Sequence, residues 1–263
     1  MLEQYQISAP ILHNQQLHGD YYQLDITAPA IARAAQPGQF IHVQLPAMPD
    51  HVLRRPFSIY DVNPTDGRLS IIYKVVGKGT EHISVLKPGT KLDILGPLGR
   101  GFSPLPGDIP SVIAAGGYGC AATFLLAKRA RVLPTVLLGG RSAGDILLQD
   151  AYESLGCQVL VATDDGSAGT KCLVTELLKR VLYEAPNSWI AACGPTPMLK
   201  AVGMIAESRK LNAEISLDRV MCCGMGACFA CVIKRKANTP EKWAYARACS
   251  DGPVFKANDI WWD

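Results

Sequence analysis

Four cysteines near the end of the chain constrain its structure more than any other feature. Cys223, Cys228 and Cys231 follow the spacing C-x4-C-x2-C, and Cys249 lies further along the chain. Three clustered thiols and one distant thiol are the plant-type pattern for a [2Fe–2S] cluster. The spacing therefore predicts these four cysteines as cluster ligands. Cys222 is adjacent to Cys223, and two neighbouring side chains cannot easily both point at one small cluster, so the spacing selects Cys223.

Two glycines in the same loop fit this prediction. Gly224 and Gly226 have no side chain, so backbone N–H groups of the loop can approach the cluster sulfides closely. A structural zinc is the main alternative, but zinc sites favour two short C-x2–4-C pairs. Disulfides fit less well, because nine cysteines is an odd number and no signal peptide is recognisable before them.

The size and charge of the chain limit its classes of function. A chain of 263 residues predicts two or three domains, and a hydrophobic fraction of 48% is ample for their cores. The net charge of +3 is small and no basic block is present, so no nucleic-acid partner is expected. The most apolar window, Ser111 to Ala127, contains a glycine turn and is short for a membrane span. We expect no membrane association and a cytoplasmic location.

Residues 1–103 are predicted to form an antiparallel β-barrel domain. Short alternating runs, such as Tyr21–Ile26 and Leu69–Val76, are separated by turn residues. One segment here is a candidate ligand-binding site. The guanidinium of Arg55 suits a pyrophosphate, and the Ser58 hydroxyl can form a hydrogen bond with a ring nitrogen. Gly79 and Thr80 precede a short predicted helix whose first N–H groups would face the same anion. Together they predict a dinucleotide such as FAD, whereas an ordinary hairpin turn is the alternative for the glycines.

Residues 104–212 are predicted to form an α/β nucleotide domain with a doubly wound parallel sheet. Strand, glycine turn and helix alternate here, and one of the expected helices runs from Asp145 to Leu155. Ligands of such sheets bind at the carboxyl ends of the strands, which is where the glycines lie. The candidate nucleotide-binding glycines of the first loop are Gly116, Gly117 and Gly119, and the last strand runs into Cys193-Gly194-Pro195.

Residues 213–263 are predicted to form a small cluster domain. So short a unit needs its metal centre for stability. The segment ends with Trp261 and Trp262, which we expect to pack on this chain or on a partner.

Taken together, these motifs resemble the ferredoxin-NADP reductase superfamily, and more closely the electron-transfer subunits of class 1B dihydroorotate dehydrogenases. The resemblance covers the whole chain and is most specific in its cysteine loop. Family members carry a C-G-x-G-A-C-x-x-C loop and a C-x-D-G-P-V-F ending, which match residues 223–231 and 249–255. On this match the ligands are again Cys223, Cys228, Cys231 and Cys249.

The resemblance also implies residues that hold FAD and NAD. The family's R-P-x-S segment, strand group and G-T pair match the following residues: Arg55, Pro56, Phe57, Ser58, Ile72, Tyr73, Lys74, Gly79 and Thr80. Its C-G-P-x-x-M segment matches Cys193, Gly194, Pro195 and Met198. The family's G-G-G-x-G followed by proline is Ala115-Gly116-Gly117-Tyr118-Gly119-Cys120 in this chain, so the choice between NAD and NADP stays open.

The function implied by the resemblance is that of an electron adapter. A hydride carries two electrons and a [2Fe–2S] cluster accepts one, so FAD must stand between NAD and the cluster. In the family, a separate FMN-containing catalytic subunit oxidises dihydroorotate in pyrimidine biosynthesis, and two copies of each subunit form a heterotetramer. No residue of this chain is expected to be a catalytic acid or base.

Two other functions remain open from the sequence. The chain could be a related NAD(P)H-dependent flavin and iron–sulfur subunit that serves another partner, because one fold supports many partners. It could also be a non-enzymatic iron–sulfur redox sensor, which would contain no flavin.

Overall fold

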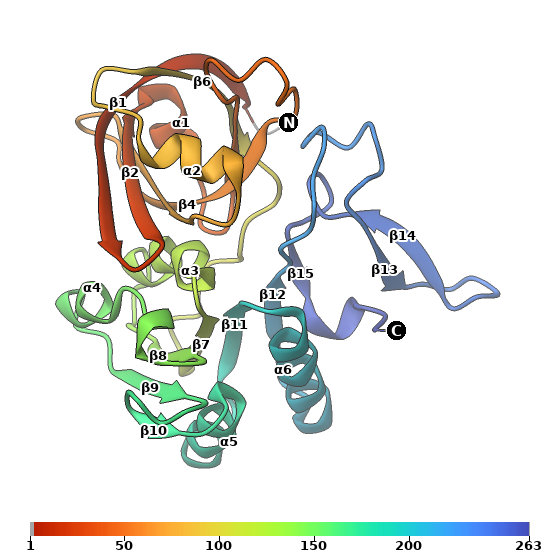
Figure 1. The fold of residues 1–263 in the computed structure, drawn as a ribbon. Coiled ribbons are helices and arrows are strands. Elements are labelled where there is room, and N and C mark those ends of the chain that lie inside the picture. The colour runs from red at the N-terminus through yellow and green to blue at the C-terminus, as the bar shows by residue number, and fades with distance from the viewer. Residues whose placement is uncertain (1–2, 263) are drawn as a thin grey trace.

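The computed structural model describes residues 3–262, which form a closed barrel, an open sheet and a two-stranded hairpin (Figure 1). The barrel comes from the N-terminal part of the chain, the open sheet mainly from the middle, and the hairpin from the C-terminal part. In Figure 1 the barrel lies above the sheet, and the hairpin lies to one side. Within residues 3–262, no helix is long and apolar enough to cross a membrane.

The barrel is antiparallel throughout, with strand order β1-β2-β5-β4-β3-β6, which confirms the predicted class of this part. Helices α1 (Pro29–Ala34) and α2 (Lys78–Ser84) accompany it. The strands are β1 Tyr5–His18, β2 Tyr21–Thr27, β3 Phe40–Val43, β4 Arg55–Asn63, β5 Arg68–Lys74 and β6 Lys91–Leu98.

The faces of β3 show how the barrel forms and how it is covered. Successive side chains of a strand point to opposite faces. Ile41 and Val43 lie in the barrel core, whereas Phe40 packs in a separate cluster with Met221 and Cys231. The outer face of β3 is therefore buried by the cysteine-rich segment.

The open sheet has the order β10-β9-β8-β7-β11-β12-β15 within the described residues. All its neighbouring pairs are parallel except β12 and β15, so the predicted parallel α/β sheet is confirmed. The strands are β7 Ser111–Gly116, β8 Thr135–Gly140, β9 Val159–Thr163, β10 Thr170–Lys171, β11 Trp189–Cys193, β12 Ala213–Ser216 and β15 Val254–Lys256. The helices are α3 Gly119–Lys128, α4 Gln149–Ser154, α5 Val174–Glu184 and α6 Thr196–Arg209.

The helix predicted from Asp145 to Leu155 was too long. The structure has a short 3-10 helix, η1 (Ala143–Asp145), and then α4, which begins only at Gln149. Leu148 between them has a φ of 62°, in the left-handed region. Because an α-helix needs right-handed backbone at every position, this residue separates the two pieces.

Helix α3 joins the barrel to the sheet, and Figure 1 shows it between them. The rings of Tyr60 on β4 and Phe124 on α3 lie 4.7 Å apart between centroids. Lys128 at the end of α3 donates to the Asp61 carboxylate at 2.7 Å. Apolar and ionic contacts therefore fix the barrel against the first helix of the sheet.

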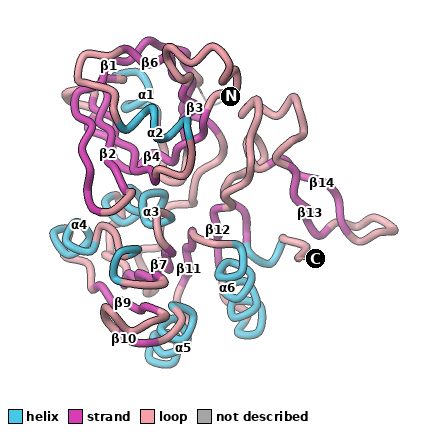
Figure 2. Tube along the Cα trace, in the orientation of Figure 1, coloured by secondary structure: helices cyan, strands magenta, loops and turns pink. Residues whose placement is uncertain are grey.

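The C-terminal part contains the hairpin of β13 (Val232–Lys236) and β14 (Trp243–Arg247), followed by β15 and the 3-10 helix η2 (Ala257–Asp259). Figure 2 shows that the segment before β13, which holds three of the candidate cysteines, is drawn entirely as loop. Strand β15 then joins the open sheet beside β12. The C-terminal part is thus connected to both of the other parts.

Candidate redox site

The structure brings the four candidate cysteines together as two pairs. The N–H of Cys228 donates to the Cys223 sulfur at 3.4 Å, and the N–H of Cys249 donates to the Cys231 sulfur, also at 3.4 Å. Among residues 3–262, no three His, Cys, Asp or Glu side chains converge as they would on one metal ion. Two pairs suit a two-iron cluster, because each iron takes two thiolates in addition to the shared sulfides.

The first pair lies in a polar loop. Desolvation alone would raise the pKa of the Cys223 thiol, but the N–H groups of Met225, Cys228 and Ala227 lower it to about 6. These N–H groups favour the charged thiolate, which is the form that binds metal. The loop is therefore arranged for a negatively charged sulfur.

The second pair is buried against the barrel. Cys231 and Cys249 are each 2% exposed and pack with Phe40 and Leu98 of the barrel. Burial raises the pKa of the Cys249 thiol to about 12, and the Cys231 sulfur contributes in the same direction. The Cys249 thiol would therefore need the positive charge of iron to ionise.

Both glycines of the loop have backbone conformations that other residues rarely adopt. Gly224 has a φ of 71° and Gly226 a φ of 88°. A Cβ atom on Gly224 would lie 2.6 Å from the His42 ring, and one on Gly226 would lie 2.8 Å from the Ser250 hydroxyl oxygen. The sequence predicted that these positions must lack side chains, and the structure adds a second reason, which is close packing on the rest of the chain.

Cys222 lies beside the first pair. Its pKa is raised by desolvation and then by the neighbouring Cys228. The structure thus brings Cys222 and Cys223 close to the same partner, and the choice between them still rests on the spacing of the motif.

The predicted flavin residues gather on one side of the barrel. Arg55 to Ser58 lie on β4, and Gly79 lies in the first turn of α2. A Cβ atom on Gly79 would be 3.3 Å from Nε of Arg55, so the helix start and the guanidinium are in contact. The Phe57 and Tyr73 rings meet edge to face with centroids 5.9 Å apart. The residues predicted to bind a pyrophosphate are thus in contact with each other, and the rings of Phe57 and Tyr73 also meet.

Three other predicted flavin residues have side chains that turn elsewhere. Ile72 is buried among residues between the barrel and the sheet. Lys74 lies 3.8 Å from the Asp145 carboxylate and over the Tyr21 ring. The Thr80 hydroxyl accepts from the N–H of Val76 at 2.9 Å, which closes the start of α2.

The predicted nucleotide residues meet at one edge of the open sheet. Strands β7 and β11 are adjacent and parallel, so their carboxyl ends coincide. A Cβ atom on Gly116 would lie 2.8 Å from Pro195, and one on Gly119 would lie 2.4 Å from the Cys193 carbonyl oxygen. A Cβ atom on Gly117 would meet no atom within 4 Å. The loop after β7 and the loop after β11 are therefore packed tightly together. The backbone at Gly117 borders open space.

Cys193 lies at the end of β11, beneath this open space. The side chain is buried, and burial raises the pKa of its thiol to about 12. A thiol with so high a pKa stays protonated at neutral pH and is a poor nucleophile. Cys193 is therefore not expected to act as a nucleophile.

One residue in this region was missed by the sequence analysis. His42, in the middle of β3, is completely buried, and neither ring nitrogen has a hydrogen-bond partner within the described part of the chain. Burial, and then the nearby charge of Arg54, lowers the pKa of His42 to about 4. A histidine between two core residues of an alternating strand was the available signal, because such a residue must point to the opposite face.

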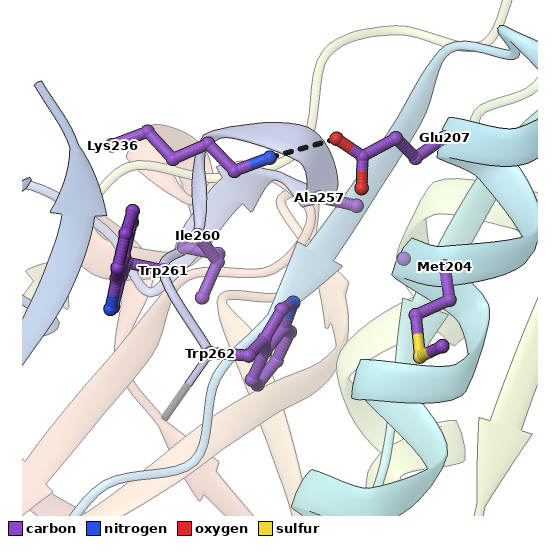
Figure 3. A pocket seen from close by; sticks show the side chains of 8 residues that line it. Met204, Glu207, Lys236, Ala257, Ile260, Trp261 and Trp262 are labelled. Carbon is purple, nitrogen blue, oxygen red and sulfur yellow. Dashed lines mark hydrogen bonds and ion pairs between the residues drawn. The ribbon is translucent and has the colours of Figure 1, made fainter. Parts of the chain in front are cut away.

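The two C-terminal tryptophans are partly buried against this chain. Figure 3 shows Trp262 between the C-terminal segment and α6, with Met204 on the helix nearby. Lys236 and Glu207 form an ion pair of 2.8 Å beside this shallow pocket (Figure 3). The backbone N–H of Trp261 donates to the Lys234 carbonyl at 3.1 Å. Packing on this chain was one of the two expectations for these residues.

Two family models match the chain in the parts that hold these residues. The model described as "Oxidoreductase FAD-binding domain" matches residues 12–102, which include the barrel strands from β2 to β6. The model described as "Iron-sulfur cluster binding domain of dihydroorotate dehydrogenase B" matches residues 218–261, which include all four candidate cysteines.

Similar proteins extend over nearly the whole chain. A protein of Desulforamulus reducens named "Dihydroorotate dehydrogenase B (NAD(+)), electron transfer subunit" is 41% identical over 246 residues, covering 92% of this chain and 93% of its own length. A protein of Fusobacterium nucleatum subsp. nucleatum with the same name is 36% identical, covering 94% of this chain and 95% of its own length.

Solved structures share the fold. The structure of an NADH-dependent reduced ferredoxin-NADP oxidoreductase, described in the context of flavin-based electron bifurcation, has a TM-score of 0.84 at 30% identity. The match covers 97% of this chain and 90% of that chain. The ferredoxin reductase in carbazole 1,9a-dioxygenase has a TM-score of 0.66 at 21% identity and covers 79% of this chain and 67% of its own, which is a likeness of fold alone.

Proposed function

The chain belongs to the family of electron-transfer subunits of dihydroorotate dehydrogenase B, and we propose that it carries electrons between NAD and a separate catalytic subunit that oxidises dihydroorotate to orotate. Its two cofactors are FAD and an iron–sulfur cluster, as the matching domains indicate. The family predicted from the cysteine and R-P-x-S motifs is confirmed. It is an oxidoreductase subunit, and FAD, when bound, would supply two-electron chemistry toward NAD and one-electron chemistry toward the cluster.

The observation that best supports this function is the contact between the cysteine loop and strand β3, which pairs with β4 and its R-P-x-S segment. Gly224 packs on His42 of β3, and His42 is paired with Pro56 on β4, inside the R-P-x-S segment. A cluster held by Cys223 would therefore lie close to a flavin held by β4. Short separation between cofactors is what an electron-transfer chain requires.

We assign each ligand role to the residues that the geometry supports. Cys223 and Cys228 would hold one iron, and Cys231 and Cys249 the other. Arg55 and the N–H groups at the start of α2 would bind the FAD pyrophosphate.

The remaining roles concern the two rings. Ser58 would donate to the flavin ring nitrogen, while Phe57 and Tyr73 would line the flavin ring on one side. The segments Gly116–Gly119 and 193–195 would bind NAD at the edge of the sheet, with Gly117 leaving room for the backbone to approach the nucleotide. No acid or base on this chain is needed for the exchange of electrons.

We also propose domain limits of 1–103, 104–212 and 213–263. Support comes from the end of β6 at Leu98 and the start of β7 at Ser111. The limit at 213 separates β12 from α6, although β12 and β15 both belong to the open sheet. A cytoplasmic location suits the chain, because cluster ligands must remain reduced thiols.

The catalytic partner would bind over the exposed side of the cluster, in a heterotetramer with two copies of each subunit. Cys228 is exposed, and three large apolar side chains lie near it in the sequence. Val220 is 86% exposed, Met225 55% and Phe229 57%. Exposed apolar patches that are surrounded by a rim of polar residues mark protein interfaces.

Replacing Phe229 with Asp tests this face. We expect weaker binding to the catalytic subunit, because a charge would be buried in the interface. Size-exclusion chromatography of the co-expressed subunits would measure how much of the chain elutes in complex with the catalytic subunit. Tyr183→Asp is the control, since Tyr183 is an aromatic residue that is 85% exposed on α5 and far from the cysteines in sequence. Equal loss in both variants would contradict the assignment of the face.

The function itself is tested by anaerobic purification with the catalytic subunit. We expect one FAD, two irons and two sulfides per chain, and reduction of NAD by dihydroorotate only in the complex. A second candidate, a subunit that serves another dehydrogenase, is favoured by the likeness to the bifurcating oxidoreductase. In that case the cofactors would be present but dihydroorotate would not reduce them. Iron without flavin would instead indicate a redox sensor.

A further inference from the structure

His42 is a buried polar side chain whose partner is absent from residues 3–262. It lies on β3, where its neighbours Ile41 and Val43 face the barrel core. The ring has no exposed surface, and both Nδ1 and Nε2 lack a hydrogen-bond partner. An unpaired buried N–H is costly and rare in native proteins. Such a group calls for a partner that the described residues do not supply.

The nitrogen-bearing edge of the ring faces the cysteine loop. A Cβ atom placed on Gly224 would lie 2.6 Å from Cε1, 2.8 Å from Nδ1 and 2.9 Å from Nε2 of His42. Cε1 is the carbon between the two nitrogens, so this edge meets the loop directly after Cys223. A neutral imidazole carries one N–H donor, and electron-rich sulfur is the acceptor expected on that side.

We propose that His42 donates its N–H to a sulfur of the iron–sulfur cluster, either a sulfide or the Cys223 thiolate, and thereby raises the reduction potential of the cluster. The inference rests on the cluster assignment above and adds a tuning residue that lies on the barrel. The reduced cluster carries one more negative charge than the oxidised cluster. A hydrogen bond from His42 therefore stabilises the reduced form more than the oxidised form.

The direct test is pulsed electron paramagnetic resonance on the complete protein, reduced with dithionite and labelled with ¹⁵N-histidine. We expect a ¹⁵N coupling to the cluster spin in the wild type. The coupling should disappear in His42→Leu and persist in the control His13→Leu, whose side chain is largely exposed on β1.

A redox titration gives an independent readout. His42→Leu should make one-electron reduction of the cluster about tenfold less favourable, a shift of about 59 mV to more negative potential. His42→Gln keeps an N–H donor and should restore part of the shift. A purely structural role for His42 would leave the potential unchanged when the cluster is intact.

The outcomes separate this inference from the proposed function. Full iron content and a normal cluster signal without histidine coupling in the wild type would overturn the role of His42 alone. Absence of iron from the wild type would overturn the cluster assignment itself. The labelled wild type decides the question even if His42→Leu does not fold.

Discussion

At the scale of single residues, two adjacent cysteines allow the ligand assignment to be tested. We expect Cys223→Ser and Cys228→Ser to lose the cluster, because a serine hydroxyl is a poor ligand where a thiolate is needed. Cys222→Ser should keep it, since the spacing selects Cys223. Iron and sulfide analysis with the visible spectrum would measure the result, and FAD should stay bound in all three variants. Loss of iron in Cys222→Ser and not in Cys223→Ser would reverse the assignment.

Two adjacent arginines offer a comparable test of the flavin site. Arg55→Ala removes the guanidinium beside Gly79 and should weaken FAD binding by about 1.5–3 kcal/mol, the usual contribution of a hydrogen bond to a charged group. Arg54 is the control, because its side chain turns away to Asp93 at 2.9 Å. Arg54→Ala should retain FAD. Fluorescence titration of the apoprotein with FAD measures the affinity of both variants. Equal affinity of wild type and Arg55→Ala would contradict the role of Arg55 in binding the pyrophosphate.

At the scale of elements, the C-terminal part has two kinds of support. The cysteine loop before β13 contains no helix or strand, whereas Ile233 and Ala246 of the hairpin and Phe255 of β15 lie in the core of the open sheet. Removal of iron should therefore release the cysteine loop but neither the hairpin nor β15. The physical reason is that the cluster is the main link between the cysteine pairs, while β15 is held by a ladder and by buried apolar surface.

Hydrogen exchange before and after anaerobic chelation of iron measures this difference. Amides of residues 221–231 should lose protection, and those of the hairpin and of Val254–Lys256 should keep it. The barrel strands β2 and β5 serve as the internal control. Equal loss of protection in β15 would mean that the cluster also holds the edge of the sheet.

At the scale of the whole molecule, the barrel and the sheet must stay docked, because FAD and NAD are proposed to bind on different parts. Phe124 on α3 is 6% exposed and contacts both Tyr60 of the barrel and Tyr152 of α4. Phe124→Ala should destabilise the protein by about 3–5 kcal/mol through loss of buried surface and the cavity left behind. Hydride transfer from NADH to FAD should slow as well.

Urea unfolding and stopped-flow absorbance are the two measurements. Val132→Ala is a suitable control, because Val132 is 49% exposed and its truncation should change stability little. A Phe124→Ala variant that is destabilised yet transfers hydride at the normal rate would show that docking of the two parts is not limiting.

Features that depend on local spacing could be predicted from the sequence. The intervals between Cys223, Cys228 and Cys231 predicted the cluster loop, and the alternation of short apolar runs predicted the barrel. Strand, glycine turn and helix predicted the parallel sheet. Such patterns are readable because side chains repeat with a period of two in strands and 3.6 in helices.

The contacts between distant segments are visible only in the folded structure. Cys249 contacts Cys231, Lys74 lies near Asp145, and Gly224 packs on His42. The folded structure also breaks the predicted helix at Leu148 and adds β15 to the sheet. These contacts join residues far apart in the chain, so no local period encodes them. They follow from packing and from the burial of polar groups, which exist only once the chain has folded.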